Sequence, residues 1–335
     1  MAVITNTYVT TSAAGKQNRE TILTDVIYFT DPKETPLFSS IDRVTVDGVK
    51  PEWLQTSLAT PNPDNAQLEG DQYTYTAINQ PSRVGSYTQI FRKEGIISKT
   101  QEAVSHVGKD DFDRAKVERG IEIRRDIEAS MLSNNASVGG TTRKSAGLRA
   151  WLATNDLMGA GGASGGYNSG TGVVDAATNG TQRAFTKALM DSALLTAYSN
   201  GGVPDMGIMS PYVKGVFSSF MSDANVAPFR VNLGRNDKRV LIGAADAYVS
   251  DWGQIDMVPN RIQALVSGLA RNVYFITPSM IKAGFLRGRD IKEDTTVVSN
   301  ADSDPFVIIG EFTLVVLHEK AHAVVADVFG LTSST

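Results

Sequence analysis

Residues 43–98 constrain the fold most, because they carry strand-forming sequence at both ends and no obvious surface on which to bury it. The first strand segment is RVTVDGVKPEWLQTSLA, the second is RVGSYTQIFRKEGIIS, and a polar segment joins them. A two-stranded ribbon is marginal in water, since each strand has one partner and little apolar area to cover. Neither the Thr/Asn/Ser-rich residues 1–40 nor the charged segment after Ser98 offers a surface. We therefore expect other copies of the chain to supply it.

The composition excludes several classes of protein. The chain has 335 residues, of which 41% are apolar, so it is long enough for one large domain or two. A net charge of -4 argues against a dedicated nucleic-acid binder, which usually carries a basic stripe, although transient contacts with DNA stay open. The chain has no cysteine, which excludes disulfides and thiolate chemistry. We find no signal-peptide pattern, and the most apolar late stretch is interrupted by Glu311, so we expect a soluble protein made in the cytoplasm.

Residues 1–42 read as an N-terminal arm. Pro32 and Pro36 restrict the residues before them to extended conformations, which allows at most one short helix here. The apolar cluster of this segment is Ile22–Phe29. Such a polar strap is ordered only where it lies on another surface.

A long amphipathic helix is expected at about residues 110–134. The segment has no proline and many helix formers, and Asp110 or Asp111 suits its N-cap. Apolar residues four apart predict a broad buried stripe, and two pairs at the same spacing predict ion pairs on the exposed side. The stripe consists of Val117 with Ile121, and Ile123 with Ile127 and Met131; the pairs are Arg114–Glu118 and Arg124–Glu128.

The second half of the chain predicts a compact α+β unit. The Gly-rich residues 159–172 resemble a phosphate loop only superficially, because they lack the Lys-Ser/Thr of a Walker loop, so we expect a flexible surface loop. A second amphipathic helix is expected over Thr181–Asn200, capped by Gly201 and Gly202. Short strand-like and helical runs then alternate, which favours a central sheet. The last apolar run reads as two adjacent strands that meet near residues 318–321.

One segment matches an enzyme signature. His318-Glu319-Lys320-Ala321-His322 fits the H-E-x-x-H pattern, whose chemistry needs both imidazoles on one face of a helix. The flanking residues are β-branched, which favours a turn between strands and a structural role. A zinc-dependent hydrolase using His318, Glu319 and His322 is the alternative from a different class.

Four basic residues follow an apolar run in the second half. We expect a solvated surface or partners of subunit salt bridges here rather than phosphate contacts. The residues are Lys282, Arg287, Arg289 and Lys292.

The order of these parts resembles the major capsid proteins of tailed bacteriophages, with the Hong Kong 97-type coat fold, and among them the SU-ten-like group. The local stretches that carry the resemblance are Thr35-Pro36-Leu37-Phe38, Glu52-Trp53, Glu69-Gly70, Arg125-Asp126-Ile127-Glu128, Gly147–Asn155 and Glu319-Lys320-Ala321-His322. The chain departs from the group at Ala323, where glycine is often found, and in the Gly-rich insertion near Gly161.

The resemblance implies an α+β fold with five parts. These are an N-terminal arm (1–42), an extended loop or two-stranded hairpin (43–98), a peripheral domain with the spine helix (99–155), an axial domain (156–300), and C-terminal strands that return to the peripheral domain (301–335). It also implies a shell subunit, not an enzyme, with no catalytic, cofactor or metal site.

The resemblance further implies partners and contacts. Copies of the chain would form pentamers and hexamers in an icosahedral virion shell around double-stranded DNA, assembled in the host bacterial cytoplasm, without a membrane. A scaffolding protein, a portal and a decorating protein are the other expected partners, and a minor head or tail protein is a further alternative. The residues expected at subunit interfaces are Trp53, Glu69, Arg83, Arg92, Leu37 and Phe38.

Overall fold

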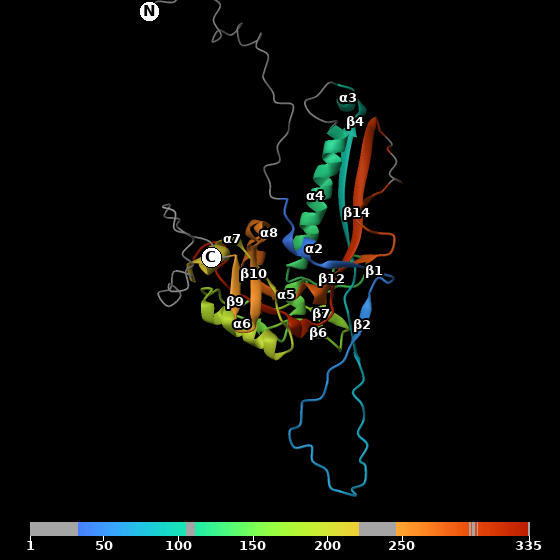
Figure 1. Cartoon of the computed structure of the whole chain (residues 1–335). Helices are drawn as coiled ribbons and strands as arrows, with labels where there is room; N and C mark the ends of the chain where they lie inside the picture. Colours follow the sequence, from blue (N-terminus) through green and yellow to red (C-terminus); the bar gives the residue numbers. More distant parts are fainter. Residues whose placement is uncertain are drawn as a thin grey trace, which may run out of the picture.

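The computed structural model describes residues 33–104, 111–220, 246–294, 296, 299 and 301–333. Two sheets, which we call peripheral and axial, lie side by side, and an extended loop leaves the molecule at its base (Figure 1). Most of the expected N-terminal arm, with Ile22–Phe29, lies outside the described residues, as does Asp110. Within the described part, no helix is long and apolar enough to cross a membrane.

The peripheral sheet joins strands that are far apart in the sequence. Its order is β1-β12-β14-β13, and β4 pairs with β14 as well. β1 runs parallel to β12, whereas β14 is antiparallel to β12 and to β4, with a register from Ser303–Ser98 to Phe312–Gln89. The strands are β1 (Asp42–Val46), β4 (Gln89–Ser98), β12 (Ile281–Leu286), β13 (Lys292–Glu293) and β14 (Ser303–Val316).

The spine helix α4 (Asp111–Met131) packs along β4 and β14, which confirms the helix expected at about 110–134 (Figure 1). Ile123, Ile127 and Met131 are fully buried, as the spacing predicted. Val117 is 56% exposed, so the buried stripe does not extend to this residue. The short helices α3 (Lys99–Ala103) and α5 (Leu148–Trp151) flank the spine in the sequence.

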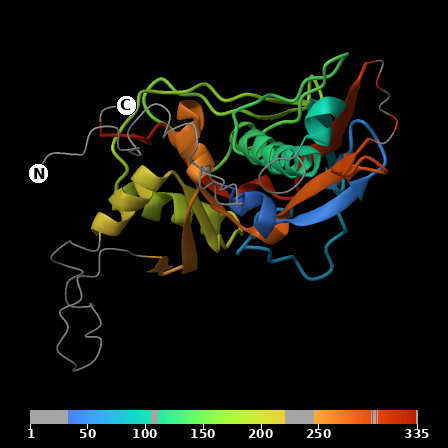
Figure 2. The ribbon, with the colours of Figure 1, turned by 90° about the horizontal axis from the view of Figure 1, so that it is seen from above.

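The axial sheet has six strands in the order β5-β15-β11-β8-β10-β9. The strands are β5 (Asp156–Leu157), β8 (Met206–Met209), β9 (Ala247–Ser250), β10 (Gly253–Pro259), β11 (Val273–Ile276) and β15 (Ala323–Val325). A second apolar core forms where α6 (Lys187–Ser199) and α7 (Pro211–Ser219) pack on it. Seen from above, these helices and α4 lie on opposite sides of the molecule (Figure 2). Gly201 follows α6 with φ +86°, which confirms the expected cap.

Two chain crossings connect the sheets. The turn η3 (Pro278–Met280) lies between β11 and β12, and the turn η4 (Glu319–Ala321) lies between β14 and β15. The C-terminal strands are therefore not adjacent partners: β14 belongs to the peripheral sheet, and β15 lies between β5 and β11 in the axial sheet. Of the strands in residues 301–335, β14 joins the peripheral sheet, as expected, whereas β15 joins the axial sheet.

Residues 43–98 do not form one continuous ribbon. Only β2 (Glu52–Gln55) and β3 (Ser82–Gly85) pair with each other, whereas β1 and β4 pair with β12 and β14 of the same chain. The partners of the end strands therefore lie more than 200 residues further along the chain, which sequence proximity did not reveal. Between β2 and β3, residues 56–81 contain no helix or strand.

The Gly-rich segment is ordered rather than a free loop. It contains the hairpin β6 (Gly166–Asn168) and β7 (Val173–Asp175). A side chain at Gly159 would overlap the carbonyl of Thr181, and one at Gly165 would overlap the carbonyl of Asp175. These glycines allow close backbone packing, so the segment lies on the surface, as expected, but includes residues paired in a hairpin.

Candidate functional site: the assembly surfaces

The extended loop between β2 and β3 exposes large apolar side chains along its length. Tyr73, Tyr75 and Ile78 are 87%, 92% and 91% exposed, and Leu58 is 96% exposed. Within residues 56–81, the hydrogen bonds that involve side chains join residues no more than two apart in the sequence. At the base of the loop, Ser82 Oγ donates to the carbonyl oxygen of Gln55. Clustered apolar exposure of this kind marks a surface that binds another molecule.

The base of the loop is anchored on its own chain. The indole of Trp53 lies 5.4 Å from that of Trp151, and its Nε1 donates to the carbonyl oxygen of Val316 at 3.1 Å. Gln55 Nε2 donates to the carbonyl oxygen of Leu317 at 2.8 Å. The half-buried Trp53 therefore fixes where the loop leaves the molecule.

Charged residues bracket the same base. Glu52 lies 3.1 Å from Lys50 Nζ and 3.3 Å from Arg83 Nη1. The hydrogen bond from Lys50, aided by Arg83, holds the pKa of the Glu52 carboxyl below its usual value. The side chain of Arg83 is 69% exposed and remains accessible to a partner.

Leu37 and Phe38, expected at a subunit interface, lie instead in the core of their own chain. Both belong to the helix α2 (Pro36–Ser40) and are 0% and 3% exposed. Phe38 packs edge-on against Phe285 of β12 with ring centroids 6.3 Å apart. Their side chains are therefore not available to a neighbouring subunit in this structure.

Glu128 on the spine helix holds α2 in place. The backbone N–H groups of Leu37 and Phe38 donate to its two carboxylate oxygens at 3.0 and 2.7 Å, and Asn260 Nδ2 donates to Oε1 at 2.6 Å. Asn260 is the N-cap of α8 (Arg261–Leu265), which is followed by α9 (Ser267–Ala270). One carboxylate thus connects the arm, the spine and the axial part.

The structure contradicts the expected Arg124–Glu128 ion pair. Glu128 is fully buried, and its partners are two amides of α2 and the side chain of Asn260. Burial raises the pKa of Glu128, while these hydrogen bonds act in the opposite direction. By contrast, Arg114 and Glu118 pair at 2.8 Å, as the spacing predicted.

Arg92 and Glu69 lie on the surface. Arg92 on β4 has a side chain that is 60% exposed and lies 3.3 Å from Glu94, and Glu69 is exposed near the tip of the loop. They belong to different parts of the chain, since Arg92 lies in the first half of β4 and Glu69 lies in the loop between β2 and β3. Within one chain, the expected interface residues are therefore not a single site.

The basic cluster makes contacts within its own chain. Arg287 lies 2.7 Å from Asp47, and Arg289 lies 3.1 Å from Glu311. Glu311 is buried and also accepts from Arg143 and from Thr88 Oγ1 at 2.7 and 2.6 Å. The carboxylate that interrupts the last apolar run therefore ties β14 to the start of β4.

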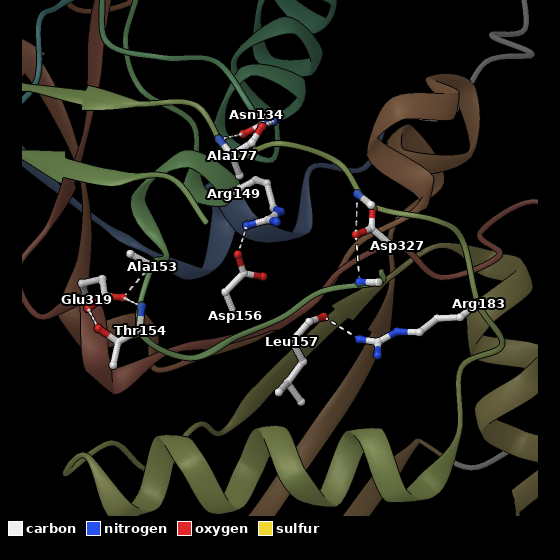
Figure 3. A network of polar contacts seen from close by, with 12 residues as sticks. Asn134, Arg149, Ala153, Thr154, Asp156, Leu157, Ala177, Arg183, Glu319 and Asp327 are labelled. Carbon is white, nitrogen blue, oxygen red and sulfur yellow. Dashed lines mark hydrogen bonds and ion pairs between the residues drawn. The ribbon is translucent and has the colours of Figure 1, made fainter. Parts of the chain in front are cut away.

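A buried polar network lies where the Gly-rich segment meets the axial sheet (Figure 3). Arg149 Nη1 donates to Asp156 Oδ2 at 2.6 Å, and both side chains are buried. Asp327 accepts from the backbone of Gly159 and Gly180 at 3.0 and 2.9 Å, and it also binds Arg271. Burial raises the pKa of Asp156 to about 6, although Arg149 opposes the shift. The sequence signal for this network was Arg149, a single charged residue within the otherwise largely apolar stretch 146–154.

The His-Glu-x-x-His segment has a structural role. It forms the turn η4, and Glu319 accepts from the N–H groups of Ala153 and Thr154 at 2.8 and 2.6 Å. His322 is fully buried, and its Nδ1 accepts from the N–H of Thr277 at 3.1 Å; burial lowers the pKa of His322 to about 3. Among the residues that the structure describes, no group of three His, Cys, Asp or Glu could hold a metal ion.

Comparison with known proteins identifies the chain. The family model described as SU10 major capsid protein matches residues 3–329, so the chain belongs to this family. It is a structural protein of the virion, the major capsid protein of a tailed-phage head shell, and not an enzyme. No curated protein sequence matches it.

Solved structures share the fold at low identity. The capsid of a native GTA particle matches with a TM-score of 0.63 and 14% identity, covering 96% of this chain and 99% of that one. The capsid of cyanophage A-1(L) matches with a TM-score of 0.62 and 12% identity, covering 93% and 98%. The SrpI encapsulin of Synechococcus elongatus PCC 7942 matches with a TM-score of 0.57 and 11% identity, covering 97% and 98%. Because an encapsulin shares the Hong Kong 97-type fold, the family match carries the assignment to a capsid.

Proposed function

We propose that the extended loop is the main contact through which this capsid protein assembles. The observation that carries the proposal is the apolar exposure of residues 56–81 on a base held by Trp53. An anchored base limits the orientations of the loop, so less entropy is lost when the tip meets a neighbour. Many such contacts, each weak alone, sum to a stable closed shell.

Trp53, Glu69, Arg83 and Arg92 contribute to this assembly in different ways. Glu69 at the tip and the exposed Arg92 are suited to direct contact between subunits, and Arg83 extends the accessible charge of the loop base. Trp53 acts by positioning, because its indole is committed to Trp151 and Val316.

The proposed product is an icosahedral shell of pentamers and hexamers around double-stranded DNA. A net charge of -4 suits a container, since strong attraction would hinder movement of the packaged DNA. A scaffolding protein, a portal and a decorating protein complete the proposed set of partners.

Replacing Thr60–Gln72 with a short Gly-Ser linker tests the proposal. We expect the subunit to keep its circular dichroism spectrum and melting temperature, because these residues make no contact with the cores. Closed shells should disappear in negative-stain images. The exposed Val249→Ser on β9 is the control and should leave assembly unchanged. Normal shells from the loop replacement would contradict the proposed function.

A further inference from the structure

Residues 73–78 have the sequence of a β-strand but no strand partner. The run is Tyr-Thr-Tyr-Thr-Ala-Ile, in which aromatic and β-branched residues dominate. An extended conformation would place Tyr73 and Tyr75 on one face and Thr74 and Thr76 on the other. In the described structure the run belongs to no strand and is exposed throughout. Its backbone donors and acceptors are thus open to pairing.

The strand β4 has the complementary property, an open edge. One edge pairs with β14 along the whole strand, and no other described strand pairs with β4. Along the strand, Ile90, Arg92, Glu94 and Ile96 are exposed, whereas Phe91, Lys93 and Ile97 alternate with them toward α4. An edge strand of this length is a template for an added strand.

Among the described residues, hollows border β4 in at least three places, and no residue of β14 lines these three. One of about 490 Å³ lies between Phe91, Ala129 of α4 and Val266. Another of about 280 Å³ continues it past Lys93 to Leu265. A third of about 530 Å³ lies beside Ile97 at the far end of the strand. Val266 and Leu265 are 46% and 57% exposed, so the walls of this space include uncovered apolar surface.

The two features do not pair within one chain, because residues 73–78 belong to no strand and β14 is the one described strand that pairs with β4. The loop extends from the base of the molecule, away from the end of β4 that carries α3 (Figure 1). Charge favours contact between the loop and a basic group on β4, because residues 56–81 contain Asp64, Glu69 and Asp71 but no lysine or arginine. Arg92 on the exposed face of β4 is a cation that such a strand would meet.

We propose that residues 73–78 of a second copy add as a strand to the open edge of β4. Tyr73 and Tyr75 then enter the hollows beside α4, while Thr74 and Thr76 lie on the exposed face with Arg92 and Glu94. This inference rests on the proposed assembly role of the loop and adds the surface that receives it. Backbone hydrogen bonds between the strands supply the affinity, and the tyrosine side chains determine which face of the added strand points toward α4.

The absence of cysteine allows a clean crosslinking test. Thr76→Cys is combined in turn with Arg92→Cys, Glu94→Cys and Ile96→Cys, which sample neighbouring registers on one face of β4. Directly opposed residues in paired strands lie close enough for a disulfide. We expect oxidation of assembled shells to give linked dimers for at least one pair. Thr76→Cys with Val249→Cys, also exposed, is the control and should give none.

The outcomes separate the inference from the function that it extends. Wild-type shells in which none of the three pairs exceeds the control would overturn strand addition and leave the assembly role standing. If Tyr75→Cys links to Arg92→Cys instead of Thr76→Cys, the assigned phase of the tyrosines is overturned. Failure of the wild type to form any shell would count against the proposed function itself.

A backbone variant gives an independent readout. Thr76→Pro removes the backbone N–H and the hydroxyl, whereas Thr76→Ala keeps the N–H and also removes the hydroxyl. We expect the proline variant, but not the alanine variant, to raise the concentration needed for assembly by about fivefold or more. The melting temperature of the free subunit should be the same for both, since residue 76 is exposed. Equal assembly by the two variants would contradict strand pairing.

Discussion

The helix α2 and the extended loop have similar kinds of sequence, but the structure buries the apolar side chains of α2 and exposes those of the loop. Both are polar, turn-rich segments that we expected to lie on neighbouring subunits. In the structure Phe38 of α2 is 3% exposed, whereas Tyr75 of the loop is 92% exposed. The difference lies in how apolar residues and backbone donors are arranged.

In α2, Leu37 and Phe38 are adjacent and sit in one helical turn that begins at Pro36. The turn presents two neighbouring N–H groups, and a single carboxylate, Glu128, accepts both. The loop spreads its apolar residues over more than twenty positions and has no such acceptor within the described chain. A short segment is thus buried by its own chain when its apolar residues are adjacent and a buried acceptor binds its backbone N–H groups. Without both features, the segment stays exposed and can bind a partner.

Truncating one aromatic side chain in each region should give the largest contrast. Phe38→Ala removes a buried ring beside Phe285, and we expect the free energy of unfolding of the subunit to fall by about 3–5 kcal/mol. Tyr75→Ala should change it by less than about 0.5 kcal/mol, because the ring is exposed in the free subunit. Urea denaturation followed by tryptophan fluorescence measures both. Equal losses would show that the two regions do not differ as described.

Sequence patterns predicted elements well when their determinants were local. The spine helix follows from residues 110–134 alone, and Gly201 ends α6 through its own backbone geometry. The Arg124–Glu128 pair was wrong for the converse reason. The spacing of charges along a helix predicts only pairs within that helix, whereas the partners of Glu128 lie 90 or more residues away in the sequence.

The same limit explains the corrections to residues 43–98. β1 runs beside β12 and β4 beside β14, and neither register is encoded by residues close in sequence. The prediction for residues 56–81 was closer to the structure. These residues pair with no other described part of the chain, so no residue distant in the sequence was needed to predict their conformation. The order of the parts came from resemblance to a family rather than from any pattern in the chain.

Acid should weaken the anchored base of the loop while leaving its tip unchanged. Trp53 and Gln55 bind the carbonyls of Val316 and Leu317, and the following turn is held by the contact between His322 and Thr277. The pKa of His322 falls from 6.5 to about 3 on burial, so the unfolded chain takes up the proton first as pH falls. Its contribution to stability is complete above about pH 6.5 and is lost toward pH 3.

Between pH 6.5 and 4.5 this group alone should cost about 2–3 kcal/mol of the free energy of unfolding. Urea denaturation across this range measures the loss in the wild type and in His322→Asn, which should lack this part of the pH dependence. His318→Asn, at a partly buried neighbour, should keep most of it. Identical pH profiles for wild type and His322→Asn would contradict the assignment.

Glu128→Gln tests whether the docking of α2 depends on a carboxylate or only on shape. All three partners of Glu128 are donors, and Asn260 cannot turn its side chain over, because its Oδ1 accepts from the N–H of Ile262 at 2.9 Å. A glutamine would place its NH₂ group against one of these donors and leave it without an acceptor. We expect a loss of about 1–3 kcal/mol in the free energy of unfolding.

Hydrogen exchange distinguishes this loss from a general weakening of the core. The amides of Leu37 and Phe38 should exchange faster in Glu128→Gln, while that of Tyr274 in β11 should change much less. The control on the same helix is Glu118→Gln, whose ion pair with Arg114 is only partly buried, and it should cost less than about 1 kcal/mol. If Glu128→Gln matched this control in both measurements, shape alone would hold α2, and the arm would differ from the loop only in its apolar residues.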